Sequence, residues 1–182
     1  MHISGYSNCD LTNGEGARVS LFVSGCTLHC HNCFNKDAWD FNYGEMWNDQ
    51  YKQKVINDLS NDYINGLSIL GGDPLEPLNI PDVCDLITTV KQKLPNKSIW
   101  LWTGRKREAI KDWPMIKKCD VVVSEPYIEK FNNHKTKYRG STNQLIWNGY
   151  TGEIIDQLMI EDQHHDNSWQ GTQLTKPISC DC

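Results

Sequence analysis

The chain has 182 residues, of which 38% are hydrophobic and 23% charged, enough for one domain with a sizeable core. The net charge of −5 arises from residue 150 onward, where six acidic residues accompany one lysine, whereas residues 1–149 carry 17 charges of each sign. A neutral body argues against sequence-independent nucleic-acid binding, which requires a basic surface.

Five apolar runs are predicted to be strands, each ending in a turn or a chemically rich segment. They cover residues 17–23, 67–70, 98–102, 120–123 and 144–147. Amphipathic patterns that predict helices lie between most of them, over residues 48–60, 80–94 and 105–111. Alternating strands and helices predict an α/β fold with a parallel sheet and right-handed crossovers.

Parallel α/β folds place their chemistry at the carboxyl ends of the strands. A cysteine loop, a Gly71-Gly72-Asp73-Pro74 turn and a Thr103-Gly104 turn follow three of the predicted strands, so we expect them to share one edge. A complete barrel needs about 250 residues, so this chain can form only part of one.

The pattern fades after Gly149. We therefore expect one domain over residues 1–149, followed by an acidic, weakly ordered extension over residues 150–182 that includes the polar stretch 163–168.

The cysteine loop has the spacing Cys26-x3-Cys30-x2-Cys33. Such a loop can hold three corners of a four-iron cluster and leave the fourth iron without a protein ligand. An open metal position binds a substrate, as in catalytic zinc sites, so the spacing indicates an enzyme. The alternative is a structural zinc site with His29 or His31 as fourth ligand, although zinc sites usually take a second ligand pair a dozen or more residues away.

The N-terminal residues 1–7 lack the basic start and apolar stretch of a signal peptide, and no apolar run approaches the roughly 18 residues that span a membrane. We therefore expect a cytoplasmic protein without membrane association. In that compartment the eight cysteines favour metal or redox chemistry over a disulfide scaffold.

The cysteine loop resembles that of the radical S-adenosylmethionine enzymes. Four further motifs, in this order, narrow the resemblance to the glycyl-radical-enzyme activases, and among these to the activating proteins of anaerobic (class III) ribonucleoside-triphosphate reductase. The motifs are Asn13-Gly14-Glu15-Gly16-Ala17-Arg18, Gly71-Gly72-Asp73-Pro74-Leu75, Trp100-Leu101-Trp102-Thr103-Gly104 and Arg139-Gly140-Ser141-Thr142-Asn143-Gln144.

The resemblance implies a partial parallel β/α barrel in which Cys26, Cys30 and Cys33 ligate a [4Fe–4S] cluster. S-adenosylmethionine would chelate the free iron, and one electron would split it into methionine and a 5′-deoxyadenosyl radical. That radical would take hydrogen from a glycine of the large catalytic subunit of the reductase, leaving a glycyl radical. A small electron donor such as a flavodoxin is also implied.

The resemblance also implies contacts to S-adenosylmethionine. Gly71 and Gly72 would hold the methionyl amine, and Asp73 would add charge. Thr103 would reach the ribose. The residues that flank Cys33, namely Asn32 and Phe34, would lie against the adenine.

Some of these residues also have a simpler interpretation. The Gly71-Gly72 backbone can approach a ligand closely because it lacks Cβ atoms, but an ordinary strand-ending turn before Pro74 needs the same residues. We expect Trp100 and Trp102 on opposite faces of their strand, in the core more often than at a cofactor.

Several alternatives stay open at this stage. Another small radical S-adenosylmethionine enzyme acting on a metabolite, such as a deazaguanine synthase, or a non-enzymatic zinc-binding module would share parts of the pattern. Residues 139–144 suit a carboxylate or a partner chain. The basic stretch 105–118 suits an acidic partner or a solvated helix face. Cys180 and Cys182 suit metal binding or an exposed tail, and Cys9 has no assignment.

Overall fold

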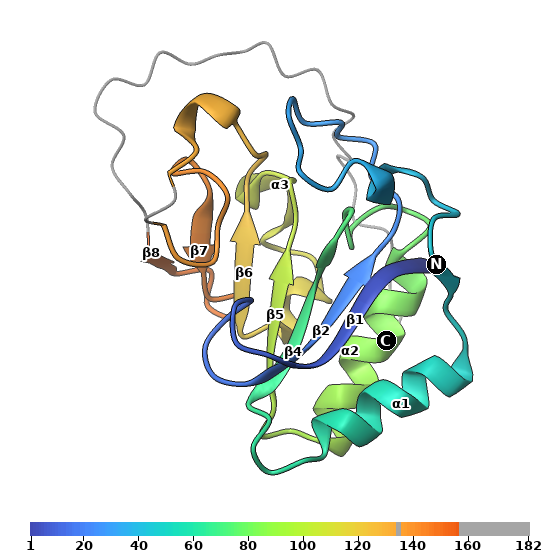
Figure 1. Ribbon diagram of the computed structural model, residues 1–182. Helices are drawn as coiled ribbons and strands as arrows, with labels where there is room; N and C mark the ends of the chain where they lie inside the picture. Colours follow the sequence, from blue (N-terminus) through green and yellow to red (C-terminus); the bar gives the residue numbers. More distant parts are fainter. Residues whose placement is uncertain (134–135, 157–182) are drawn as a thin grey trace.

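The computed structural model describes residues 1–133 and 136–156 and shows a mixed α/β architecture built on one eight-stranded sheet (Figure 1). The strands lie in the order β3-β1-β2-β4-β5-β6-β7-β8. Their bounds are β1 His2–Asp10, β2 Arg18–Val23, β3 Glu45–Met46, β4 Gly66–Gly71, β5 Ser98–Trp102, β6 Val121–Ser124, β7 Leu145–Trp147 and β8 Ile154–Asp156. The helices are α1 Asp49–Leu59, α2 Ile80–Lys93 and α3 Arg107–Ile110, with short 3-10 turns η1 Asp37–Trp39, η2 Ile116–Lys118 and η3 Glu129–Phe131.

The four central strands are parallel, as the alternation of strands and helices predicts. β2 pairs with β4, β4 with β5, and β5 with β6, all in the parallel sense. The register sets Val23 beside Gly71 and Trp102 beside Val123. The cysteine loop, the Gly-Gly turn and the turn after β5 therefore leave the sheet at one edge, the upper edge in Figure 1. The predicted convergence of these motifs is confirmed.

The last predicted strand forms, but in the opposite direction to the parallel strands. β7 pairs antiparallel with β6, with Val122 opposite Trp147. A parallel return requires a crossover connection, usually a helix. The described part of the segment between Ser124 and Leu145 contains only the 3-10 turn η3, so the chain returns beside β6 in the antiparallel direction.

Three flanking strands, β1, β3 and β8, were not predicted from the sequence. β1 has few apolar residues and joins β2 in an antiparallel pair that is interrupted by register shifts. β8 pairs antiparallel with β7, and its three residues are exposed. It lies within the 150–182 segment that was expected to be weakly ordered. The polar stretch 163–168, Cys180 and Cys182 lie outside the described residues.

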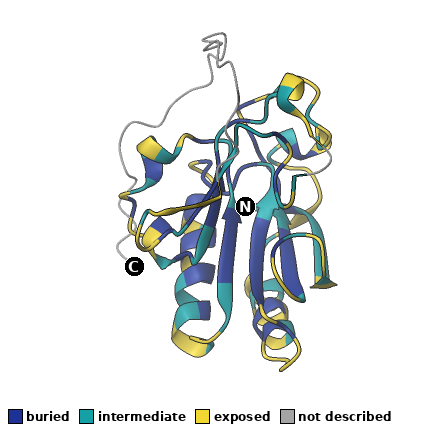
Figure 2. Ribbon diagram, turned by 90° about the vertical axis from the view of Figure 1, so that its left-hand side faces the viewer, coloured by how far each residue is buried: buried dark blue, intermediate teal, exposed yellow. Residues whose placement is uncertain are grey.

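Two of the predicted helices agree with the structure to within one residue at each end. α1 begins after Asn48, whose side chain accepts a hydrogen bond from the Tyr51 backbone N–H at 2.9 Å. α2 buries the face that its periodicity predicts, including Leu86 and Ile87. Both helices cover one face of the sheet (Figure 1), and the strands beneath them are buried along most of their length (Figure 2). The third helix is shorter than expected, a single turn.

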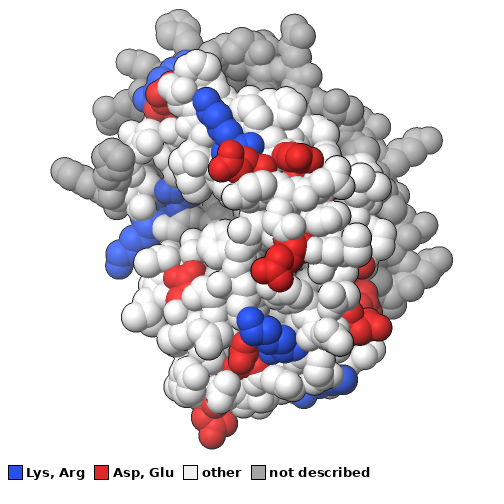
Figure 3. Space-filling view, turned by 45° about the vertical axis from the view of Figure 1, so that its right-hand side comes forward, with Lys and Arg blue, Asp and Glu red and all other residues white. Residues whose placement is uncertain are grey.

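The described surface carries charges of both signs. On the face shown in Figure 3, acidic and basic side chains lie interspersed among uncharged residues. In the basic stretch 105–118, Arg107 and Lys111 both pair with the exposed Glu108 at 2.5 Å, which matches a solvated helix face, whereas Arg105 is buried. In the described part of the chain, no helix combines the length and the apolar character needed to cross a membrane.

Candidate functional site

The cysteine loop winds back on itself through two residues in the left-handed backbone region. His29 has φ 45° and Asn32 has φ 52°, and each precedes one of the later cysteines. The Cys33 N–H donates to the Cys30 carbonyl at 3.0 Å, which closes the turn between them. Cys26 is buried, with 7% of its surface exposed, whereas Cys30 and Cys33 are half-buried. The loop thus runs from the core to the surface at the carboxyl edge of the sheet.

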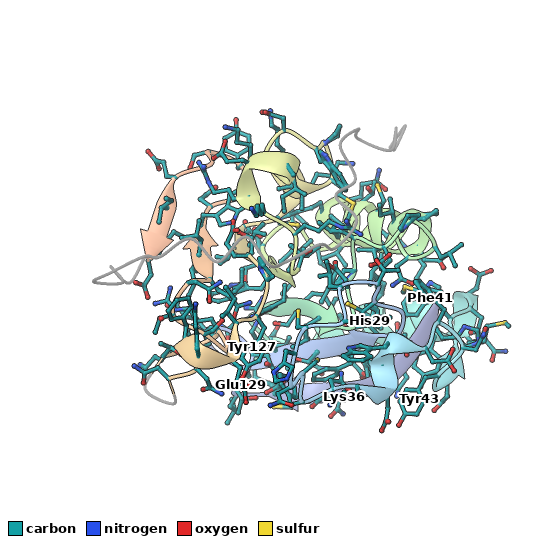
Figure 4. All side chains as sticks on the ribbon, turned by 90° about the horizontal axis from the view of Figure 1, so that it is seen from above. His29, Lys36, Phe41, Tyr43, Tyr127 and Glu129 are labelled. Carbon is teal, nitrogen blue, oxygen red and sulfur yellow. The ribbon has the colours of Figure 1, made fainter. Side chains whose placement is uncertain are left out.

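The return of the loop holds its first part in place. The Gly25 N–H donates to the Ala38 carbonyl at 2.8 Å, and the Cys26 N–H donates to the Trp39 carbonyl at 3.2 Å. The His29 ring packs against Trp39 with ring centroids 4.5 Å apart and 34° between the ring planes. Figure 4 looks down on this edge and labels His29 of the cysteine loop and Tyr127 and Glu129 of the segment that follows β6. The His31 and Asn32 side chains of the loop both contact the Glu129 carboxylate. The site therefore combines the loop after β2 with the segment after β6.

The donor chemistry of the loop fits an iron–sulfur cluster, whose ligands are cysteine thiolates. Burial raises the pKa of Cys26 to about 12 and also raises the pKa of Cys30, so both are protonated thiols in the metal-free protein. Metal binding would release these protons. Within residues 1–133 and 136–156, no three His, Cys, Asp or Glu side chains converge closely enough to hold a single metal ion. All three thiols lie on one loop, and the half-buried Cys30 and Cys33 give access from the surface.

The Gly71-Gly72 turn packs against the backbone of the cysteine loop. A Cβ atom on Gly72 would lie 2.5 Å from the Gly25 carbonyl oxygen, and one on Gly71 would lie 2.4 Å from the Val23 carbonyl oxygen. Gly71 also has φ 116°, a conformation open to glycine. The chain's own packing thus requires both glycines, and the contact of this turn with a ligand stays a prediction.

Asp73 and Thr103, both predicted to contact S-adenosylmethionine, bind each other. The Thr103 hydroxyl donates to the Asp73 carboxylate at 2.9 Å, and the Leu75 N–H donates to it at 2.8 Å. Asp73 is fully buried, which raises the pKa of its carboxyl to about 6. The pair ties the end of β4 to the end of β5 below the edge of the sheet, and direct contact of either side chain with a ligand stays a prediction.

The two tryptophans of β5 share one face of the strand. The rings of Trp100 and Trp102 stack with centroids 5.6 Å apart and 29° between their planes. Residues two positions apart in a strand point the same way, so the prediction of opposite faces was wrong. Trp100 is 6% exposed and belongs to the buried interior, as its residue type predicts.

The residues between and after the later cysteines face Glu129 and a polar cavity. Asn32 donates to the Glu129 carboxylate at 2.6 Å, and His31 Nδ1 lies 2.9 Å from the same carboxylate. Phe34 is 94% exposed. A cavity of about 500 Å³ opens here, and it is lined by Asn32, Phe34, Tyr127, Glu129, Asn132, Asn133, Thr136, Arg139 and Gly140. Asn32 and Phe34, predicted to lie against the adenine, thus border the same hollow.

Of the motifs that carry the resemblance, the one over residues 13–18 lies away from the cysteine loop, whereas the one over residues 139–144 borders the same cavity as Asn32 and Phe34. Arg18 starts β2, at the opposite end of the strand, and is 1% exposed. Its guanidinium donates to the Ser68 hydroxyl at 2.7 Å and to the Leu67 carbonyl at 2.8 Å. Arg139 binds a carboxylate within the chain itself, that of Asp156 in β8, at 2.8 Å. These two arginines therefore stabilise the sheet in the described structure.

Sequence reasoning missed the buried residues that brace the cysteine loop. Asn79 is 1% exposed and donates to the carbonyls of Ser24 and Asp73, at 2.9 and 3.0 Å. Glu76, 2% exposed, accepts from the N–H and the hydroxyl of Thr27. Both follow the Gly-Gly turn, and their partners Thr27 and Ser24 lie 49 and 55 residues away along the chain, so no local pattern indicates them.

Comparison with known proteins identifies the family of this chain. The family model described as a 4Fe-4S single cluster domain matches residues 12–147, which include the whole cysteine loop. The chain is 42% identical to the anaerobic ribonucleoside-triphosphate reductase-activating protein of Enterobacteria phage T4, over 79% of this chain and 92% of that relative. The chain belongs to the family of these activating proteins.

Other activating proteins match over a similar share of the chain. Identity is 39% to the activating protein of Haemophilus influenzae, over 78% of this chain and 94% of the relative. It is 35% to that of Escherichia coli (strain K12), over 80% of this chain and 97% of the relative. The resemblance found in the sequence motifs is thereby confirmed, and the matched cluster domain favours iron and sulfide over a zinc site at the loop.

Proposed function

We propose that this chain activates an anaerobic ribonucleotide reductase by reductive cleavage of S-adenosylmethionine at a [4Fe–4S] cluster held by Cys26, Cys30 and Cys33. The observation that carries the proposal is the placement of three thiols on one loop, at the carboxyl edge of a parallel sheet, inside the matched cluster domain. The names of the relatives indicate an anaerobic ribonucleoside-triphosphate reductase as the partner, and we propose that its large catalytic subunit carries the glycine.

When bound and reduced, the cluster would supply one electron to S-adenosylmethionine, giving methionine and a 5′-deoxyadenosyl radical that takes a hydrogen atom from a glycine of the reductase. The chain's own residues shape the surroundings of that reaction. The loop return holds Cys26 in the interior, and the half-buried Cys30 and Cys33 lie toward the surface. A partner chain therefore reaches the loop from the carboxyl edge.

We assign the remaining contacts to S-adenosylmethionine from the same placement. The Gly71-Gly72 turn would receive the methionyl amine, and Asn32 and Phe34 at the edge of the cavity would face the adenine. Asp73 and Thr103 would contribute indirectly, because their hydrogen bond fixes the turn after β4 to the turn after β5. We also propose that residues 1–149 form a partial barrel of the radical S-adenosylmethionine type, and that the extension over residues 150–182 adds β8 to its sheet.

The experiment begins with anaerobic reconstitution using iron and sulfide, followed by metal and sulfide analysis. Reduced protein is then mixed with S-adenosylmethionine and the reductase, with flavodoxin or a chemical reductant as electron donor. We expect deoxyadenosine together with a glycyl radical signal by electron spin resonance. Alanine at any of the three loop cysteines should abolish both products, whereas Cys9→Ala, on the exposed part of β1, should retain them.

The outcomes separate the alternatives. Deoxyadenosine without a glycyl signal would indicate an enzyme that acts on a metabolite. One zinc ion per chain without sulfide would indicate a structural zinc site. Normal turnover by a Cys30→Ala protein would contradict the proposed cluster ligation.

A further inference from the structure

The segment that follows the Gly-Gly turn binds the start of the cysteine loop at three residues, Ser24, Gly25 and Thr27, which lie on both sides of Cys26. The Ser24 carbonyl accepts from the Asn79 side chain at 2.9 Å. The Gly25 carbonyl accepts from the Asp73 N–H at 2.9 Å. The third contact is made to Thr27, directly after Cys26, and it comes from the Glu76 side chain. A single segment thus fixes the backbone on both sides of the first cysteine.

Glu76 makes the one contact of these three that carries a charge. Its Oε1 accepts from the Thr27 N–H at 2.9 Å and from the Thr27 hydroxyl at 2.8 Å. The side chain is 2% exposed, so both bonds are largely shielded from water on the Glu76 side. Hydrogen bonds to a charged acceptor are about twice as strong as neutral ones. They fix the backbone N–H that follows Cys26, which the loop return does not hold.

Arg105 offsets the cost of burying the Glu76 carboxylate by pairing with it. Its Nη2 lies 3.4 Å from Glu76 Oε1, and its side chain is 4% exposed. Its Nε donates to the Leu75 carbonyl at 3.2 Å, next to Glu76 in the chain. A buried carboxylate needs such a partner because desolvation of an unpaired charge costs several kcal/mol. The pair therefore links the turn after β5 to the loop after β2 through one carboxylate.

The Glu76 carboxylate lies beside Cys26, because it accepts from the backbone N–H of the next residue in the chain. A fixed charge that acts on a ligand sulfur also acts on a cluster bound to it, because local charge and hydrogen bonding set the potential of iron–sulfur clusters.

We propose that Glu76 is a positioning residue for the cluster: it clamps the Cys26–Thr27 corner of the loop and, paired with Arg105, places a fixed negative charge beside the first cysteine ligand. The clamp is a property of the chain itself. The effect on a cluster rests on the function proposed above.

The clamp is tested first on the metal-free protein, by hydrogen–deuterium exchange of peptides covering residues 25–28. Glu76→Ala should speed exchange there about tenfold or more, which is the effect of losing a hydrogen bond to a charged acceptor. Glu76→Gln keeps an acceptor oxygen for Thr27 and should exchange within a few-fold of the wild type. Unchanged exchange in the alanine variant would overturn the clamp.

A second pair of variants covers the case in which Glu76→Ala does not fold. Thr27→Val keeps the shape of this exposed side chain and removes only the hydroxyl bond to Glu76, whereas Thr27→Ser keeps that bond. After reconstitution, iron loss to a chelator should be several-fold faster for the valine variant, and the serine variant should match the wild type. Equal rates for the two variants would count against the clamp.

The charge is tested by the midpoint potential of the reconstituted cluster. Glu76→Gln should raise the potential, because a nearby negative charge is lost while Arg105 stays, and a purely structural role would leave the potential unmoved. Glu108→Gln, an exposed carboxylate on α3, is the matched control and should not change it. An unshifted potential in Glu76→Gln would overturn the electrostatic role. If no cluster forms even in the wild type, the proposed function fails instead, and the exchange experiment still decides on the clamp.

Discussion

The buried carboxyl of Asp73 should give the stability of this protein a distinct pH dependence. Burial raises its pKa from the ordinary 3.8 to about 6, against the opposing effects of Arg105 and of the hydrogen bonds from Leu75 and Thr103. Between these two values the folded state binds more protons than the unfolded state. The free energy of unfolding therefore falls as the pH rises through this window and is level above it.

The magnitude follows from the size of the shift. Each pKa unit corresponds to about 1.4 kcal/mol, so the carboxyl should cost the folded state roughly 3 kcal/mol once it is ionised. Asp73→Asn removes the titration and keeps the shape and an acceptor for Thr103. The variant should therefore gain about 2–3 kcal/mol relative to the wild type between pH 4 and pH 7.

Chemical denaturation of the reduced, metal-free protein at several pH values measures this difference. Asp112→Asn is the control, because Asp112 is 79% exposed and makes only a surface ion pair with Lys117. Its difference from the wild type should stay within a few tenths of a kcal/mol across the range. If the curves of Asp73→Asn and the wild type run parallel from pH 4 to pH 7, the burial argument is wrong.

Two further substitutions test the packing on which the site depends. Gly72→Ala should destabilise the protein by about 1–3 kcal/mol in urea denaturation, since its Cβ would meet backbone atoms of the cysteine loop, whereas Gly5→Ala, with its nearest atom 3.5 Å away, should be nearly neutral. An equal change in stability for Gly72→Ala and Gly5→Ala would show that the Gly-Gly turn can accommodate a Cβ atom. Arg18→Met should cost about 2–3 kcal/mol, because it leaves the buried Ser68 hydroxyl and the Leu67 carbonyl without a donor. Iron bound per chain after reconstitution should stay at the wild-type level for Arg18→Met, and a loss of iron would contradict the separation of the two strand ends.

The local sequence pattern was sufficient to predict the elements that depend only on residues close together in the chain. The helical spacing of Val83, Leu86 and Val90 sets both the existence and the buried face of α2. The strand–helix alternation sets the parallel centre and, with it, the edge where the cysteine loop and the Gly-Gly turn meet.

The features that escaped prediction depend on residues far apart in the chain. β1 has little apolar pattern of its own, and it becomes a strand because β2 offers an edge for pairing. The direction of β7 depends on how the segment after β6 returns, which strand composition does not encode. Glu76 meets Thr27 across 49 residues, and Asn79 meets Ser24 across 55, so neither contact leaves a local signal.

The motifs that identify the family divide between the two ends of the parallel strands. Arg18, at the amino end, donates hydrogen bonds to Ser68 and to backbone carbonyls. These bonds stabilise the sheet independently of the residues at the carboxyl end. The cysteine loop, the Gly-Gly turn and Thr103 lie at the carboxyl end and are tied to one another by Asp73. Since the two groups share no contact among the described hydrogen bonds, a family member could lose a loop cysteine and still keep this sheet. Motif order is therefore strong support for the fold, whereas the proposed activity requires the residues at the carboxyl end.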